Sequence, residues 1–359
     1  MGSEPERKIK VLIVDDSAIV RKLLTEALTG HGDIEVVGTA PDPYIARDKI
    51  LALHPDVVTL DIEMPRMDGL TFLKKLARFH PIPVIVISSL AQASSQAALE
   101  AMRSGAVHVL AKPGGPYSVG ELRLDLAHHV RAAAEAGARR RLMPLPAPVA
   151  SEDAAGSAQS ARPCAIFKGA LPDSLIAIGA STGGTEALQH ILVQLPENVP
   201  AIVITQHIPA GFSHAFANRL NQLCKFHVKE AADGDLAQPG TALIAPGDFH
   251  MLIRKNGAGY RAVVKSGPRV CYQRPSVDVL FDSVAEAAGA KAIGVILTGM
   301  GNDGAQGLLQ MKRKGARTLA QDEASCVVFG MPREAIQAGA VDHVIPLKDM
   351  ARGILAQFN

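Results

Sequence analysis

Acidic, hydroxyl and amine side chains follow apolar runs in the first third of the chain, and together they suit phosphoryl chemistry. Asp15 and Asp16 follow the run VLIV, Asp61 follows DVVTL, Ser88 follows PVIVI, and Lys112 stands in LAKP. Three converging carboxylates repel one another unless a hard cation binds, and oxygen ligands of this kind suit Mg²⁺. Asp61 can then act as the nucleophile on phosphorus, with Ser88 and Lys112 receiving the new oxygens.

A second group of reactive side chains lies in the latter half. Ser181 follows SLIAIG in a glycine-rich turn, His207 follows AIVITQ, and Asp303 follows AIGVILTG within GNDG. A serine before a helix N-terminus has free N–H groups nearby that suit an oxyanion, although a phosphate-binding loop uses the same amides. Asp303 alone is equally suited to cap a helix. The three residues together favour a Ser-His-Asp triad, in which His207 takes the serine proton.

The other histidines are weaker candidates for the base. Only His250, in APGDFHM, is a serious rival to His207. The others lie within expected helices, within an expected strand or far toward the C-terminus: His190, His214, His227 and His343.

The elements that must hold these residues form two α/β domains. From Lys8 to about Glu135, short β-branched runs alternate with amphipathic stretches, which is typical of a parallel sheet covered on both faces. The rhythm resumes at SLIAIG, with a hairpin expected between Pro246 and Lys265. We therefore predict two doubly wound parallel-sheet domains, with ligands beyond the carboxyl ends of the strands. Helices of the second domain are expected over residues 185–195, 211–223, 277–288 and 304–314.

Composition agrees with two globular units. The chain has 359 residues, of which 48% are hydrophobic and 20% charged, so it exceeds one ordinary core. The Ala-, Ser- and Pro-rich stretch in between has no apolar period and reads as a linker. We predict a first domain over 1–136, a linker over 137–168 and a second domain over 169–359.

Bulk features also bound the location and partners. The net charge of +2 predicts neither a nucleic-acid nor a membrane partner, and the basic run 139–141 fits a solvated linker. The four cysteines form no Cys-x-x-Cys pair, which argues against zinc and disulfide frameworks. The start lacks an apolar signal segment, and no apolar run reaches the length of a membrane span. We expect a cytoplasmic protein without membrane insertion.

The first domain resembles the receiver domains of bacterial response regulators, which are flavodoxin-like. The resemblance covers roughly residues 8–130 and rests on the Asp15-Asp16 pair, DIEMPRMDG over 61–69, Ser88, and LAKP. It implies that Asp61 takes the phosphoryl group and that Ser88 moves on phosphorylation.

The same resemblance implies the metal ligands. Mg²⁺ would be held by Asp16, Asp61 and the main-chain carbonyl of Glu63, with Asp15 nearby. One departure concerns the switch: Val109 stands where such receivers often carry an aromatic residue, three positions before the lysine.

The second domain resembles the catalytic domain of the chemotaxis protein-glutamate methylesterases, the CheB family, expected to be Rossmann-like. The motifs are GASTGGTEAL, TQHIPAGFS, APGDFHM and LTGMGNDGA. The resemblance implies Ser181 as nucleophile, His207 as general base and acid, and Asp303 as orienting acid. It also implies an oxyanion hole from the Met300 amide with Thr182.

What this family acts on follows from the same resemblance. The implied substrate is a glutamate methyl ester on the cytoplasmic helical bundle of a chemoreceptor, with release of methanol, and some members also deamidate glutamine. A chemotaxis histidine kinase is the implied phosphodonor, and no cofactor is expected in the esterase site. We further expect the unphosphorylated receiver to inhibit the esterase in cis.

The sequence argues against two other function classes. A nucleotide-binding oxidoreductase would need an acidic ribose ligand about 20 residues after the glycine turn. Gln206 and His207 stand there instead. A DNA-binding regulator would need a small helix-turn-helix output with a basic recognition helix, whereas the second half is strand-rich.

Overall fold

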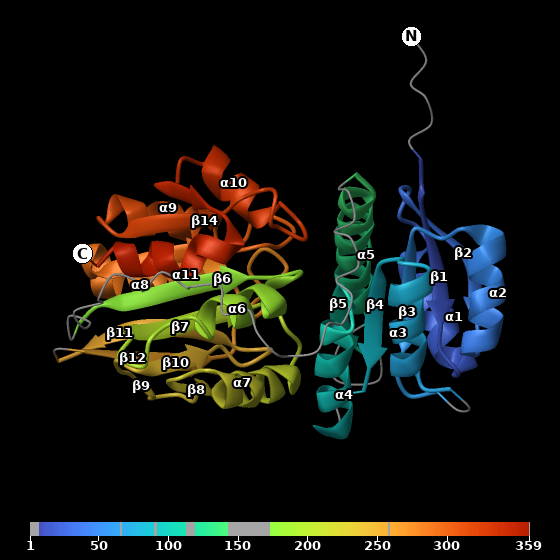
Figure 1. Ribbon diagram of the computed structural model, residues 1–359, viewed down its shortest axis with the longest axis horizontal. Coiled ribbons are helices and arrows are strands. Elements are labelled where there is room, and N and C mark those ends of the chain that lie inside the picture. The colour runs from blue at the N-terminus through green and yellow to red at the C-terminus, as the bar shows by residue number, and fades with distance from the viewer. Residues whose placement is uncertain are drawn as a thin grey trace, which may run out of the picture.

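Two parallel sheets, each covered by helices on both faces, make up the molecule (Figure 1). The structure is a computed structural model, and it describes residues 7–64, 67–89, 92–112, 119–142, 173–257 and 259–358. The two doubly wound α/β domains predicted from the sequence are confirmed.

The receiver sheet has the order β2-β1-β3-β4-β5, and all its strand pairs are parallel. In β1, Leu12 and Val14 pack beneath α2, α3 and α4, whereas Val11 and Ile13 pack beneath α1 and α5. This alternation buries both faces of the sheet. The elements are β1 (Ile9–Val14), α1 (Ala18–Leu28), β2 (Ile34–Ala40), α2 (Pro43–Leu53), β3 (Val57–Asp61), α3 (Gly69–Phe79), β4 (Val84–Ser88), α4 (Gln92–Arg103), β5 (His108–Ala111) and α5 (Val119–Leu142).

Side-chain caps fix where the receiver helices begin. Asp42 accepts hydrogen bonds from the amides of Tyr44 and Ile45 at the start of α2, and Asp68 accepts one from the Thr71 amide at the start of α3. Such caps satisfy N–H groups that have no partner within the helix. They hold the loops after β2 and β3 at the edge of the sheet that carries the acidic residues.

Helix α5 is longer than the sequence predicted. It continues to Leu142, so the expected domain boundary at 136 falls inside the helix. The physical reason is that alanine and arginine, which fill this stretch, are both strong helix formers. Arg139 also contacts the second domain, which explains why the helix persists there. The rest of the predicted linker, 143–168, lies outside the described residues.

The second domain is built on a seven-stranded sheet of order β15-β14-β13-β6-β7-β10-β8, in which every strand pair is parallel. A three-stranded antiparallel sheet contains the expected hairpin. The elements are β6 (Leu175–Ala180), α6 (Gly184–Leu192), β7 (Ala201–Gln206), α7 (Phe212–Leu223), β8 (His227–Glu230), β9 (Leu236–Ala237), β10 (Thr241–Ile244), β11 (His250–Asn256), β12 (Gly259–Lys265), α8 (Val277–Ala288), β13 (Ala292–Ile296), α9 (Ala305–Arg313), β14 (Arg317–Gln321), α10 (Met331–Gln337), β15 (His343–Ile345) and α11 (Leu347–Ala356).

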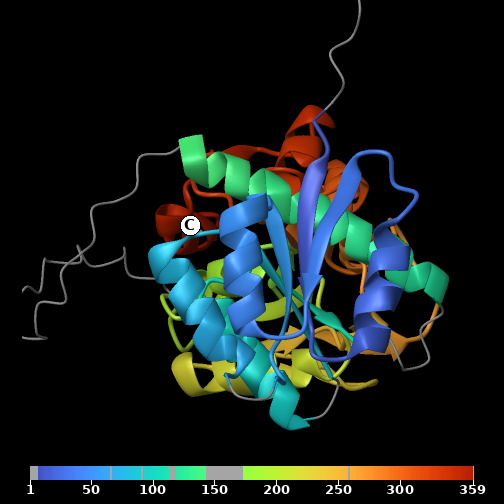
Figure 2. The ribbon, with the colours of Figure 1, turned by 90° about the vertical axis from the view of Figure 1, so that its right-hand side faces the viewer.

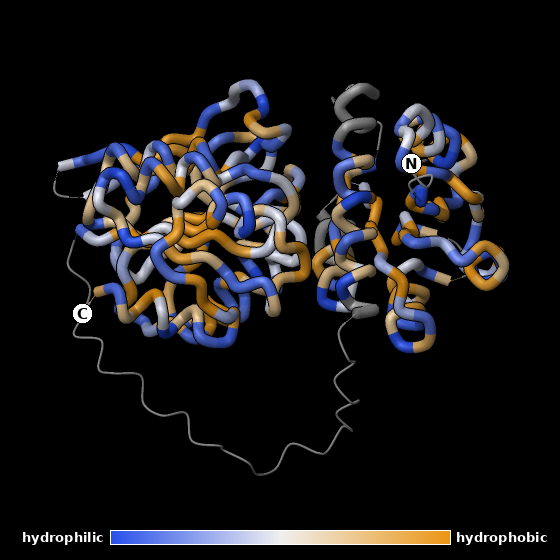
Figure 3. The backbone as a smooth tube through the Cα atoms, turned by 90° about the horizontal axis from the view of Figure 1, so that it is seen from above, coloured by the Kyte–Doolittle hydropathy of each residue, from blue (hydrophilic) through white to orange (hydrophobic). Residues whose placement is uncertain are grey.

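The central strands of both sheets are the most apolar segments and lie inside the layers (Figure 3). In β6, Leu175 and Ala177 pack with α8 and α9, while Ile176 and Ile178 pack with α6, α7 and α11. Strand β6 lies between β13 and β7, so the chain turns to opposite sides of the sheet there. That switch point opens a crevice at the carboxyl ends of the strands.

Close packing of α8 on α9 gives a stability prediction. A Cβ added at Gly307 would lie 2.7 Å from Phe281 Cβ and 2.9 Å from the Asp278 carbonyl oxygen. We expect Gly307→Ala to lower the free energy of unfolding by about 1–3 kcal/mol because the helices must separate. Gly32→Ala is the control, because a Cβ there meets nothing within 4 Å. Thermal unfolding followed by circular dichroism measures both, and equal midpoints would contradict this packing argument.

The two domains meet through one side of the receiver. Helices α4 and α5 and the edge strand β5 form the side of the receiver that faces the second domain, and α5 runs across that face (Figures 1 and 2). Leu99 of α4 joins the core cluster of the second domain, and Phe212 of α7 joins the receiver cluster. Each domain therefore contributes a large side chain to the core of the other.

Candidate active site and phosphorylation pocket

The predicted acidic residues meet at the carboxyl ends of β1 and β3, where the receiver sheet reverses its strand order. Lys112 Nζ lies 2.6 Å from Asp61 Oδ2 and 3.6 Å from Asp15 Oδ2. The Ser17 amide donates to Asp15 Oδ1, and the Glu63 amide donates to Asp61 Oδ1. Asp15 and Asp61 are buried, whereas Asp16 is exposed at the mouth of the pocket.

Burial dominates the electrostatics of this pocket. It raises the pKa of Asp61 to about 6, although Lys112 and the Glu63 amide oppose the rise. Burial also raises the pKa of Asp15. Burial thus destabilises the ionised form of both carboxylates, so a cation in this site would be bound favourably.

The carboxylate oxygens fit a divalent cation. One oxygen from each of Asp15, Asp16 and Asp61 lies within 4.8 Å of the other two. Asp15 Oδ2 is buried and accepts no hydrogen bond. Three hard oxygen donors with one unsatisfied lone-pair site are the ligand chemistry that Mg²⁺ prefers.

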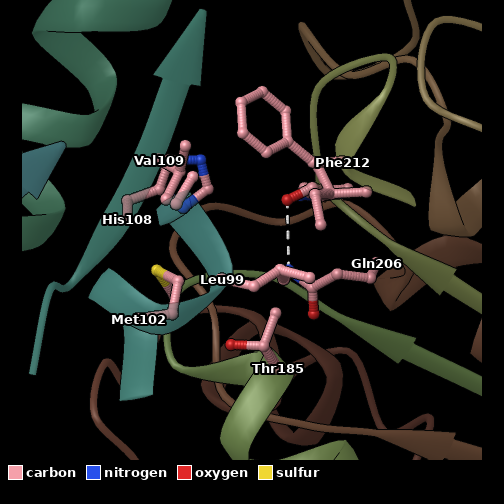
Figure 4. A pocket seen from close by; sticks show the side chains of 10 residues that line it. Leu99, Met102, His108, Val109, Thr185, Gln206 and Phe212 are labelled. Atoms are coloured by element: carbon pink, nitrogen blue, oxygen red, sulfur yellow. Dashed lines mark hydrogen bonds between the residues drawn. The ribbon is translucent and has the colours of Figure 1, made fainter. Parts of the chain in front are cut away.

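Ser88 and Val109 connect this pocket to the domain interface. Ser88 ends β4, is fully buried, and has no hydrogen-bond partner for its hydroxyl. Val109, on the adjacent strand β5, lies in the same apolar cluster as Phe212 of the second domain. The position of the usual aromatic residue is therefore taken by a smaller side chain that packs at the interface (Figure 4).

In the second domain, Ser181, His207 and Asp303 follow β6, β7 and β13, three neighbouring strands of the sheet. His207 Nε2 donates to Asp303 Oδ2 at 2.7 Å, and both side chains are almost fully buried. Ser181 Oγ and His207 Nδ1 are buried and have no hydrogen-bond partner. The structure thus places all three predicted residues at the switch-point crevice and leaves His207 Nδ1 as the nitrogen able to accept the serine proton.

Four donors hold the Asp303 carboxylate. Val277 N joins His207 on Oδ2, while Ser276 Oγ and Asp278 N donate to Oδ1 at 2.8 and 3.0 Å. Burial would raise the pKa of Asp303, but the hydrogen bonds from His207 and the amides outweigh it and lower that pKa. The first turn of α8 therefore keeps this acid ionised.

The backbone of Ser181 is held by hydrogen bonds from Gln206 and to Thr298. Gln206 Nε2 donates to the carbonyls of Ser181 and His207, so one amide side chain joins the two reactive residues. The Ser181 amide donates to Thr298 O. A Cβ at Gly299 would lie 2.6 Å from Ser181 Cβ, so only glycine lets the β13 loop approach the serine.

Thr182 and Met300, predicted to form the oxyanion hole, lie on either side of this contact. Thr182 is fully buried, its carbonyl accepts from Thr298 Oγ1, and its own hydroxyl has no partner. Met300 directly follows Gly299 and packs at the receiver interface with Val328 and Ala132. Thr182 and Met300 are thus the direct chain neighbours of the two residues, Ser181 and Gly299, that meet at this contact.

Sequence reasoning missed the residues that support the site. Gln206 precedes His207. In the sequence it indicated only that the acidic ribose ligand of a nucleotide-binding fold is missing. Ser276 carried the signal of an N-cap before an apolar helix, SVDVLF, but nothing in the sequence placed it beside Asp303. His250, the rival base, is buried beside Ser276 rather than hydrogen-bonded to Ser181.

The receiver lies across the segment that carries His207. A small pocket at the interface is lined by His207, Ile208 and Phe212 from one domain and by Leu99 and Val109 from the other (Figure 4). Loops further along the crevice are tied to α5 by ion pairs: Arg269–Asp125 and Arg139–Glu323, both 2.9 Å.

Three receiver histidines gather at the same interface. The rings of His108 and His129 stack 3.7 Å apart, and His128 lies edge-on to His129 and beside Gly301 of the second domain. Burial, followed by repulsion from the neighbouring rings including His207, lowers the pKa of His108 to about 3. Burial, His207 and Arg131 lower that of His128 to about 4.

We expect this cluster to make domain docking pH-dependent. The docked state keeps His108 and His128 neutral. Their contribution to the stability of docking is therefore full above the ordinary pKa of 6.5 and is lost as the pH falls toward 4. Burial also lowers the pKa of His129 well below 6.5, and the positive charge of the nearby Arg269 lowers it further. Protonation of His129 would therefore also oppose docking. We expect the radius of gyration from small-angle X-ray scattering to increase between about pH 6.5 and 4. A radius that stays constant over this range, or that responds equally in His128→Gln, would contradict the expectation.

Comparisons with known proteins agree with the geometry. The family model described as CheB methylesterase matches residues 176–354, and the response regulator receiver domain model matches residues 11–121. The chain is 56% identical over 349 residues to a protein-glutamate methylesterase/protein-glutamine glutaminase of Syntrophus aciditrophicus, covering 97% of this chain and 98% of the relative. It is 51% identical to the protein of that name from Escherichia coli K12, covering 98% and 97%.

A solved structure agrees as well. The CheB methylesterase catalytic domain of Thermotoga maritima superposes with a TM-score of 0.51 at 38% identity, covering 52% of this chain and 99% of that chain. Within the part of the chain that the structure describes, no helix is long and apolar enough to cross a membrane.

Proposed function

Because the chain belongs to the CheB methylesterase family and carries a receiver domain, we propose that it hydrolyses glutamate methyl esters on chemoreceptors under the control of phosphorylation at Asp61. The observation that carries the proposal is the 2.7 Å contact between His207 and Asp303 beside the unpartnered hydroxyl of Ser181. The substrate would be the methylated glutamate side chains on the cytoplasmic helical bundle of a receptor, so the protein would act in the cytoplasm.

The chemistry follows from which atoms are already engaged. Ser181 Oγ attacks the ester carbonyl carbon while its proton passes to His207 Nδ1, because Nε2 donates to Asp303. Asp303 then stabilises the imidazolium, and the tetrahedral oxyanion is held by the Met300 amide with Thr182. The imidazolium returns the proton to the departing methoxide, which leaves as methanol. Water attacks the acyl-enzyme by the same route and releases glutamate.

Glutamine deamidation is a second activity that the same groups support. An amide would give the same acyl-enzyme, with ammonia leaving in place of methanol. The relatives at 51–56% identity are named for both activities. We propose the second activity on this ground.

Phosphorylation would act through the receiver. Asp16, Asp61 and the Glu63 carbonyl, with Asp15, would hold Mg²⁺, which supplies positive charge against the incoming phosphoryl oxygens. Asp61 would attack phosphorus, and Ser88 and Lys112 would contact the new oxygens. Movement of Ser88 would shift β4 and β5 against Phe212 and loosen the interface that covers His207. A chemotaxis histidine kinase would be the phosphodonor.

Breaking one interface ion pair should mimic this loosening in part. Asp125→Ala removes the ion pair with Arg269, and such a pair contributes up to about 1 kcal/mol. We expect the basal esterase rate of the unphosphorylated protein to rise about two- to fivefold. Asp349→Ala, which removes the Arg352 pair on α11, is the matched control. Lower or unchanged basal activity in Asp125→Ala would contradict inhibition in cis.

The proposed activity is tested by adding the purified protein to membranes that contain methylated chemoreceptors. Methanol release and mass spectrometry of receptor peptides report ester hydrolysis, and the mass change of unmodified glutamine sites reports deamidation. Loss of methyl groups at receptor glutamates supports the proposal. Receptors whose methylation is unchanged after prolonged incubation would overturn it.

A further inference from the structure

A chain of hydrogen bonds runs from the β12–α8 loop to Asp303, and His250 stands in the middle of it. His250 Nε2 donates to Pro268 O at 2.9 Å, and Nδ1 accepts from the Ser276 amide at 3.3 Å. Ser276 Oγ donates in turn to Asp303 Oδ1 at 2.8 Å. The chain of contacts thus links Pro268 to the carboxylate that holds His207.

The contacts fix the tautomer of His250. A carbonyl faces Nε2 and an N–H faces Nδ1, so the contacts place the ring proton on Nε2 and leave Nδ1 as the acceptor. A protonated ring would direct a second N–H against the Ser276 amide. His250 is 3% exposed, and a Cβ at Gly267 would lie 3.3 Å from its Cδ2, so the ring packs closely against this glycine.

Both ends of this chain are anchored. Ser276 is the N-cap of α8 and is fully buried, so its hydroxyl and amide have fixed directions. The loop that carries Pro268 is held by Arg274, whose guanidinium bonds to Asp248 and to Gly267 O. A displacement of His250 must therefore displace Ser276, and with it the Asp303 carboxylate.

We propose that His250 is a positioning residue for the ester hydrolysis. It sets the place of Ser276, and Ser276 holds Asp303 in line with His207 Nε2. The proposal rests on the esterase function proposed above. Its effect should appear in the chemical step, because a small misplacement of a catalytic group can cost about a hundredfold in rate.

Three substitutions at one position separate the two contacts of the ring. In His250→Asn the side-chain oxygen lies near the place of Nδ1 and can still accept from the Ser276 amide. In His250→Gln the side-chain nitrogen lies near the place of Nε2 and can still donate to Pro268 O. His250→Ala removes both contacts, and His227→Ala, at an exposed histidine of the same domain, is the control.

The experiment measures kcat, KM and the pH profile of kcat/KM for methanol release, with active sites counted by a fluorophosphonate probe. We expect His250→Ala to lower kcat about 10- to 100-fold with little change in KM. Its acid limb should move to lower pH, since a misaligned Asp303 stabilises the His207 imidazolium less. His250→Asn should recover most of the rate and the acid limb, whereas His250→Gln should resemble the alanine variant.

A double-mutant cycle tests the route through Ser276. If His250 acts through this residue, His250→Ala should have little further effect in a Ser276→Ala background. The proposal is overturned if the acid limb stays in place in every variant, if Gln rescues as well as Asn, or if the two losses in kcat are additive. If His250→Ala does not fold, the comparison of Asn with Gln still decides the question. A wild-type protein that releases no methanol would instead refute the proposed function itself.

Discussion

Asp303→Asn should lower kcat/KM for ester hydrolysis by about 10³–10⁴-fold while leaving the fold of the receiver intact. His207 Nε2, Val277 N, Ser276 Oγ and Asp278 N all donate to this carboxylate. An asparagine has only one oxygen, so its NH₂ group must face two of these four donors. The ring of His207 then loses its acceptor or turns to the wrong tautomer, and serine deprotonation is lost.

The measurement compares steady-state methanol release with the rate of fluorophosphonate labelling at Ser181. Both rates should fall together because both need a deprotonated serine. Asp282→Asn provides the control, since Asp282 is exposed on the same helix α8. If Asp303→Asn retained more than about a tenth of the wild-type rate, Asp303 would not be the orienting acid.

Ser181→Ala should abolish turnover to at least about 10⁴ below wild type, since the acyl-enzyme can no longer form. The hydroxyl is buried, has no partner, and lies at the switch point between β13 and β7. Removing one oxygen from this site should leave the fold unchanged, because the serine backbone contacts with Thr298 and Gln206 persist. Labelling by a fluorophosphonate should vanish as well.

Ser266→Ala is the matched control for the nucleophile. Ser266 is exposed in the loop that follows β12, and its replacement should alter neither turnover nor labelling. Hydrolysis that survives in Ser181→Ala would refute a covalent serine mechanism and would leave His207 activating water directly.

The reactive residues were predictable because parallel strands all end at one edge of a sheet. Asp15 and Asp61 follow the adjacent strands β1 and β3, and Ser181, His207 and Asp303 follow three neighbouring strands, so topology alone brings each group together. Family motifs were still needed to prefer a triad over a phosphate loop at ASTGG. Helix and strand patterns of period 3.6 and 2 gave most elements within a few residues.

The supporting residues were not predictable, because strand topology does not bring them to the site. Ser276, at the start of α8, contacts Asp303, and His250, at the start of β11, contacts Ser276. Both contacts depend on how the helices pack on the sheet. The histidines of α5 carry no motif, and only domain docking places His128 beside Gly301. The extension of α5 to Leu142 is a similar case, since contacts with the second domain favour a helix where composition suggested a linker.

Inhibition in cis fits the placement of the interface. Ile208 and Phe212, which pack against the receiver, lie within five residues after His207, and Val109 belongs to the same cluster. A shift of β5 can therefore reach the base of the triad within one loop. The switch would then work without the usual aromatic residue, because an apolar contact at Val109 would replace a rotating ring.

The most direct test of the account measures methanol release from methylated receptor membranes with and without a small-molecule phosphodonor and Mg²⁺. Wild-type protein and Asp61→Asn are compared at equal concentration. We predict that the phosphodonor accelerates the wild-type protein several-fold and leaves Asp61→Asn at its basal rate. Equal stimulation of both proteins, or of neither, would contradict the claim that the Asp61 pocket governs the esterase at Ser181.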